Sequence, residues 1–78
     1  MEYILGAVIL FGAKWEMEGW MICDGRILQI SRYQALYSIL GPQYGGDGRS
    51  TFALPKIDAP VEGSTYQICV MGIYPRRK

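Results

Sequence analysis

The hydrophobic positions begin with one apolar run, from Ile4 to Phe11, which is partly β-branched and bounded by Gly12. A short continuous apolar run of this kind is typical of a buried strand rather than of a helix. It therefore predicts a strand covered on both faces. Gly6 inside the run indicates a bend or a close backbone approach.

Two further strand-like runs flank an Asp-Gly pair. Trp20–Cys23 precedes Asp24-Gly25, and Arg26–Ile30 follows it. An Asp-Gly pair between strand-like runs is the strongest short-range signal for a β-hairpin. The sequence therefore predicts a hairpin with a type I′ turn at Asp24-Gly25.

A short helix is predicted next. Ser31 and Gln34 have the spacing of a capping box, in which each side chain bonds to a backbone amide at the start of a helix. The apolar positions that follow have helical spacing: Tyr33, Leu36, Tyr37 and Leu40. Gly41 and Pro42 supply the end. We expect two to three turns packed on a sheet.

The second half of the chain predicts a loop and two more strands. Tyr44–Ser50 is glycine-dense and polar, hence a loop, and Thr51–Leu54 is a short strand that Pro55 ends. Lys56–Ser64 is irregular. The last run, Thr65–Ile73, is rich in β-branched and aromatic residues and should pair with an earlier strand, with the first as a candidate.

These elements predict an α+β fold, mostly β with one short helix, in a single domain over residues 1–78. Half of the 78 residues are hydrophobic, which is a globular composition, but so small a core contributes only about 3–5 kcal/mol. Some additional stabilisation is expected. Cys23 and Cys69 form no recognisable disulfide framework, so buried free thiols are favoured, although their redox state stays open.

A metal is also disfavoured as the source of that stability. The chain has no histidine and only two cysteines, so a tetrahedral zinc site lacks ligands. No cofactor is predicted either. Self-association into a homo-oligomer remains the favoured way to stabilise the fold.

Charge and hydropathy exclude other classes of partner. The net charge is +1, and the C-terminal Arg76, Arg77 and Lys78 are best explained as a solvated tail, so nucleic-acid binding is disfavoured. Glu2 stands where a signal peptide would be positive, and Lys14-Trp15-Glu16 stands where small residues should precede cleavage. The first apolar run is too short to span a bilayer, so no membrane association is expected.

Catalysis is disfavoured because the chain lacks histidine, and with it the Ser/His and Cys/His nucleophilic pairs. The carboxylates show no spacing that indicates an acid/base pair, and Asp24 is better explained by its turn. The sequence thus predicts no catalytic residue.

The glycine-rich loop is the one candidate binding site, at Tyr44, Gly45, Gly46, Asp47, Gly48, Arg49 and Ser50. Successive glycine amides can form an anion-binding nest, and Arg49 adds a planar charged donor. A Walker motif does not fit, because Arg49 replaces its lysine and a strand follows. In the alternative interpretation, Asp47 and Arg49 bond the loop's own backbone and hold it rigid. Among the aromatic residues, Trp20 and Tyr37 are expected in the core, and Trp15 and Tyr74 are the candidates for exposure.

An ordered set of motifs resembles the phage tail collar domain over Ile4 to Pro55. The residues that carry the resemblance are Gly19-Trp20, Cys23-Asp24-Gly25, Leu28, Ile30-Ser31, Ala35-Leu36, Ser38, Leu40-Gly41, Tyr44 to Arg49 and Thr51 to Pro55. The closing segment, a strand over about residues 65–74 that includes Tyr66 to Cys69 and Gly72 to Pro75, is similar to bacterial collar-domain proteins of the microcystin-dependent type.

The resemblance implies a small α+β domain of tail fibres and tail-associated proteins, often trimeric and without enzymatic activity. After Pro55 the family usually continues with an Asp-Leu-Arg-Gly-Arg-like segment and a long variable region, whereas here Lys56–Ala59 leads almost directly to the final strand. No fibre-forming repeat precedes the domain, so a small virion component or a free-standing domain is expected.

Two functions follow from these observations. The first is a structural module of a phage or prophage tail, oligomeric, with other tail proteins as partners and the virion tail as its location. The second is a soluble oligomeric binding protein of the host bacterial cytoplasm, in which the glycine-rich loop and arginines capture a small anionic, nucleotide-like ligand or a glycan.

Overall fold

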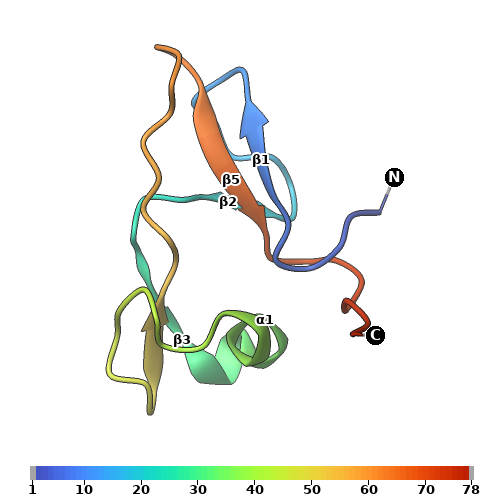
Figure 1. Ribbon diagram of the computed structural model, residues 1–78, viewed down its shortest axis with the longest axis vertical. Coiled ribbons are helices and arrows are strands. Elements are labelled where there is room, and N and C mark those ends of the chain that lie inside the picture. Colours follow the sequence, from blue (N-terminus) through green and yellow to red (C-terminus); the bar gives the residue numbers. More distant parts are fainter. Residues whose placement is uncertain (1, 78) are drawn as a thin grey trace.

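The computed structural model describes residues 2–77, so Met1 and Lys78 lie outside the described residues (Figure 1). It is mostly β with one short α-helix, as the sequence predicts. The elements in chain order are β1 (Val8–Phe11), β2 (Trp20–Ile22), β3 (Ile27–Gln29), the 3-10 helix η1 (Ile30–Arg32), α1 (Gln34–Leu40), β4 (Thr51–Ala53) and β5 (Thr65–Cys69).

The strands form two small antiparallel sheets. In the three-stranded sheet β5 lies between β1 and β2, with Val8 opposite Ile68 and Trp20 opposite Cys69. In the two-stranded sheet β3 pairs with β4. The three-stranded sheet forms one half of the view in Figure 1, and β3, β4 and α1 form the other. The predicted pairing of the closing strand with the first is therefore confirmed, and β5 pairs with β2 as well.

The predicted hairpin at Asp24-Gly25 is wrong, because the runs on its two sides belong to different sheets. A type I′ turn needs positive φ at both central residues, and no non-glycine residue within 2–77 has a positive φ. Asp24 instead accepts a hydrogen bond at Oδ1 from the Arg26 N–H at 3.0 Å. The backbone of Asp24 also pairs with that of Lys56 in an isolated antiparallel β-bridge. The chain crosses from one sheet to the other at this point.

The first strand is shorter and more exposed than predicted. It begins at Val8 because Gly6, with φ 88°, turns the chain, and the Ala7 N–H donates to the Ile4 carbonyl. It is not covered on both faces: Val8 and Leu10 are 40% and 45% exposed. Val8 and Leu10 alternate with the less exposed Ile9 and Phe11, so the face of β1 that carries Val8 and Leu10 is the one left open.

The helix is confirmed, but its predicted capping box is wrong. The chain enters through η1, the N-cap residue is Tyr33, and no side chain caps the helix. Ser31 lies inside the 3-10 helix, two residues before Tyr33, and so not at the N-cap position that the predicted capping box would have given it. The helix ends as expected at Gly41, whose φ is 63°. Its apolar stripe packs inward, with Leu36 1% exposed.

One hydrophobic cluster connects the two sheets and the helix. Its buried members are Leu5, Cys23, Leu28, Leu36, Phe52, Leu54 and Ile68. The Phe52 ring packs edge-on against Tyr37, with centroids 5.3 Å apart. The core therefore takes residues from both ends of the chain and from its middle.

The chain between β1 and β2 is held to the three-stranded sheet by one buried amide. Gln67 on β5 has no exposed surface. Its Oε1 accepts from the Met17 N–H at 3.0 Å, and its Nε2 donates to the Trp15 carbonyl at 2.9 Å. A buried polar side chain of this kind is tolerated because its hydrogen bonds are made. Trp15 itself is 64% exposed and Trp20 is 9% exposed, as the sequence predicts.

Both cysteines are free and buried, as predicted. Burial raises the pKa of the Cys23 thiol from 9.0 to about 11. No helix within residues 2–77 is both long enough and apolar enough to cross a membrane.

Candidate functional site

The glycine-rich loop, Tyr44–Ser50, connects the end of α1 to β4 and folds back along that strand. The Ala53 N–H donates to the Gly45 carbonyl at 3.0 Å, and the Gly48 N–H donates to the Thr51 carbonyl at 3.0 Å. These groups of β4 point away from β3, so the loop covers the outer edge of the two-stranded sheet (Figure 1).

Gly46 allows this close approach. A Cβ added at Gly46 would lie 2.5 Å from the Cα of Phe52 and 2.7 Å from the Thr51 carbonyl oxygen, and its φ is 85°. No other residue type fits without moving the backbone. The glycine therefore serves the contact between loop and strand.

Asp47 organises the rest of the loop. Its Oδ1 accepts hydrogen bonds from the N–H groups of Arg49, Ser50 and Thr51 at 2.8, 2.9 and 3.0 Å. Its Oδ2 accepts from the Ser50 hydroxyl at 3.0 Å. These hydrogen bonds hold the pKa of the Asp47 carboxyl well below its usual range, and the bond from the backbone N–H of Thr51 has the largest effect.

The backbone donors of the loop are largely used internally. The Gly45 N–H donates to the Pro42 carbonyl, and the Asp47 N–H donates to the Thr51 hydroxyl. Since Asp47 occupies the amides of residues 49–51, an incoming anion would have to displace a carboxylate already in place. This arrangement favours the interpretation in which the loop bonds its own backbone.

The structure brings all seven predicted site residues together in one loop. Tyr44 is 47% exposed, and the Arg49 side chain is exposed and makes no hydrogen bond or ion pair with any other residue in the range 2–77. Tyr44 and Arg49 are thus two side chains of the loop that a ligand could reach. Ligand binding here remains a prediction.

Asp24 has a structural partner. Arg26 donates from Nε and Nη2 to its two carboxylate oxygens, both at 3.0 Å, and also from Nη2 to Glu16 Oε2 at 2.7 Å. The hydrogen bonds from Arg26 lower the pKa of Asp24. Glu16 accepts in addition from the Ile22 N–H at 2.7 Å. These charges join the segment before β2 to the crossing between the sheets.

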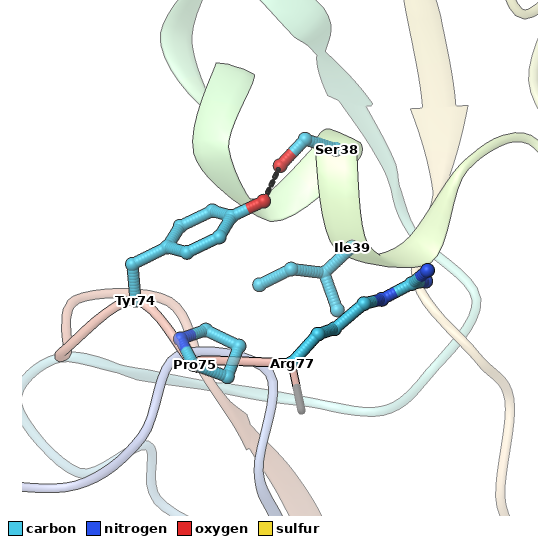
Figure 2. Close-up of a pocket in the computed structure, with 5 residues that line it drawn as sticks. All are labelled: Ser38, Ile39, Tyr74, Pro75 and Arg77. Carbon is cyan, nitrogen blue, oxygen red and sulfur yellow. Dashed lines mark hydrogen bonds between the residues drawn. The ribbon is translucent and has the colours of Figure 1, made fainter.

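A pocket that sequence reasoning missed lies between α1 and the C-terminal segment (Figure 2). It has a volume of about 270 Å³ and is lined by Ser38, Ile39, Tyr74, Pro75 and Arg77. The Ser38 hydroxyl donates to the Ala35 carbonyl, so the Tyr74 hydroxyl must donate to Ser38 Oγ across their 2.6 Å contact. The only sequence signal was the expected exposure of Tyr74, which is 54% exposed.

This pocket has two apolar walls, Ile39 and Pro75, and one cation, Arg77. Its hydroxyl groups bond to each other rather than pointing into the space. Within residues 2–77, no group of three Cys, His, Asp or Glu side chains could hold a metal ion.

Comparison with known proteins places the chain in a family. Residues 6–61 match the model of the phage tail collar domain. This is more than half of the chain, and the sequence therefore belongs to the phage tail collar domain family.

A second comparison is short. Over 30 residues the chain is 53% identical to Protein RhiB of Rhizobium leguminosarum bv. viciae. The matched segment is 38% of this chain and 14% of RhiB. The chain thus spans a small part of that relative's length. No solved structure matches the chain.

Proposed function

We propose that this protein is a non-enzymatic structural module of a phage or prophage tail and that it works as a homo-oligomer. The observation that carries the proposal is the match of residues 6–61 to the phage tail collar domain. The virion tail is its location in this role, and other tail proteins are its docking partners.

The site geometry supports a structural role. Asp47 and Asp24 are each engaged by donors that fix a loop or a crossing, and lowered pKa values make both poor general acids at neutral pH. The glycine-rich loop covers the edge of β4. Each of these groups therefore has a role in holding the fold.

Exposed apolar side chains support self-association or docking. Trp15, Val61 and Met71 are 64%, 60% and 76% exposed in a chain of 8.8 kDa. So small a domain usually needs an additional source of stability, and association supplies it by burying such surface.

The test is native mass spectrometry of the protein purified from cells, with mass spectrometry of purified phage tails beside it. We expect a homo-oligomer without extra mass and detection of the protein in tails. A monomer at all concentrations would contradict the oligomer, and absence from tails would contradict the tail role.

The alternative is capture of a small anionic ligand or a glycan by the glycine-rich loop, in a free-standing protein of the bacterial cytoplasm. It predicts a reproducible extra mass on the native protein. Arg49→Ala should then abolish that mass, while Arg32→Ala, at an exposed arginine on η1, should leave it unchanged. A bare oligomer, or retained mass in Arg49→Ala, would argue against the loop as a binding site.

A further inference from the structure

The pocket between α1 and residues 74–77 is built from parts that the N-terminal segment holds in place. The Ile73 N–H donates to the Tyr3 carbonyl at 2.9 Å, so the chain that leads into residues 74–77 is fixed. A Cβ built at Gly6 would lie 3.4 Å from Cγ2 of Ile39, so the same segment also packs closely against one wall of the pocket. A site formed before its ligand arrives loses less entropy on binding.

The walls of this pocket are largely apolar. Ile39 and Pro75 carry no polar side-chain atom, and Tyr74 adds an aromatic ring. Figure 2 shows the Tyr74 ring on one side of the space and Ile39 with the stem of Arg77 on the other. The volume of about 270 Å³ is near the lower end of the range for ligand pockets, about 300–1,000 Å³. The size and lining therefore suit a small ligand with an apolar part.

The hydroxyl groups of the pocket have no proton left to donate. The Ser38 hydroxyl donates to the Ala35 carbonyl, and the Tyr74 hydroxyl donates to Ser38 Oγ. Among the five lining residues, free side-chain donors therefore come from Arg77 alone. No carboxylate within residues 2–77 forms an ion pair with Arg77. A ligand must thus present an acceptor to Arg77, and it can donate to the Tyr74 oxygen, which keeps a free lone pair.

The charge of the lining selects one kind of acceptor. A guanidinium group is planar and matches a carboxylate with two parallel hydrogen bonds. A phosphate monoester carries a charge of about −1.5 to −2 at neutral pH, and the single lining cation would leave part of that charge unpaired beside apolar walls. None of the five lining residues is acidic, so none repels an anion. The lining therefore favours a carboxylate with a single negative charge.

We propose that the pocket beside Tyr74 binds a small carboxylate that carries a short apolar group. The carboxylate pairs with the Arg77 guanidinium, and the apolar group lies between Ile39 and Pro75. Two sources supply this chemistry: a free short-chain acid, and the C-terminal residue of another protein chain, whose amide N–H can donate to the Tyr74 oxygen. The site lies within one chain, so it is independent of subunit number and additional to the structural role proposed above.

The test is NMR titration of the full chain with isocaproate, followed at the methyl groups of Ile39. Arg77→Gln removes the charge from the pocket, and Arg76→Gln is the matched control, because Arg76 is exposed and does not line the pocket. We expect saturable binding with equal Kd in wild type and Arg76→Gln, and a Kd at least about tenfold higher in Arg77→Gln, with circular dichroism showing that both variants remain folded. Isocaproamide, which is neutral, and acetate, which lacks the apolar group, should each bind at least about tenfold more weakly than isocaproate.

A second ligand distinguishes the two sources. N-acetyl-leucine is isocaproate with an acetamido group added, and it therefore carries the amide N–H of a chain terminus. A lower Kd than that of isocaproate would assign the pocket to a protein C-terminus, and an equal or higher Kd would assign it to a free acid. Binding that does not saturate, an unchanged Kd in Arg77→Gln, or equal binding of isocaproamide would overturn the carboxylate site. Such a result would leave the proposed tail role standing, because native mass spectrometry and the analysis of phage tails test that role separately.

Discussion

At the scale of single residues, the loop depends on one carboxylate. Asp47 accepts three backbone N–H groups and one hydroxyl although the residue is exposed. A carboxylate bonded in this way is stabilised in its charged form, because each donor favours the negative charge. The same charge would repel an anion that approached Arg49, which argues against anion binding at this loop.

Asp47→Asn should lower the melting temperature by several degrees near neutral pH, because a neutral amide is a weaker acceptor. The lowered pKa of Asp47 fixes the sign of the pH dependence: as pH falls below 3.8, the unfolded state takes up the proton first. The contribution of Asp47 is therefore present above that pH and lost below it. Melting curves from pH 2 to 7 should show the two proteins converging in acid. Asp58→Asn, at an exposed carboxylate outside the loop, should melt at the same temperature as the wild type throughout this pH range. A difference in melting temperature between wild type and Asp47→Asn that stays constant from pH 2 to 7 would refute the explanation.

Cys23 should be unreactive in the folded protein. The residue is 2% exposed, and burial raises the pKa of its thiol to about 11, so almost no thiolate is present at pH 8. Iodoacetamide with mass spectrometry should give no label at Cys23 in native protein and complete labelling in urea. As pH rises from 9.0 towards 11, the unfolded state loses the proton first, and stability should fall in that window; Cys23→Ala should remove this part of the loss. Rapid native labelling would show that the core opens at this point.

At the scale of elements, loop and strand are fitted to each other at Gly46. Gly46→Ala places a methyl group against the backbone of Phe52, and with the strain of a positive φ it should cost about 2–4 kcal/mol. Gly12→Ala is the matched control, since its Cβ would meet no atom within 4 Å, and it should stay within about 0.5 kcal/mol of wild type. Urea unfolding measures both. Equal stability of the two variants would mean that the loop does not lie on β4.

The elements also show where sequence reasoning succeeds. The helix could be predicted because its stripe and its stop at Gly41 are local signals. The prediction of a hairpin failed because Trp20–Ile22 pairs with β5, a strand far along the chain, and not with the strand that follows the adjacent Asp-Gly. The Asp24 carboxylate, which the prediction placed in a hairpin turn, instead accepts hydrogen bonds from Arg26. Strand existence was predictable, and strand partners were predictable only for the closing strand.

At the scale of the molecule, the candidate site was predictable as a segment and not as a geometry. Tyr44–Ser50 was identified as one loop by its glycines, and both uses of its amides were foreseen. Which one holds depends on where the Asp47 carboxylate lies, and spacing alone cannot fix that position. The pocket beside Tyr74 was missed because Ser38 and Arg77 come from segments that only the folded chain brings together.

The shared hydrophobic core leads to a prediction for the whole chain, that it unfolds as one domain. Phe52 on β4 and Ile68 on β5 belong to one buried cluster, so weakening either sheet should weaken both. Phe52→Leu should cost about 1–2 kcal/mol. The loss of stability should appear equally in two signals. One is the fluorescence of Trp20, which lies in the three-stranded sheet, and the other is far-ultraviolet circular dichroism. Val61→Ala, at a side chain 60% exposed, should shift neither transition. Two separate transitions, with Trp20 insensitive to Phe52→Leu, would mean that the sheets are independent units and that one domain is the wrong description.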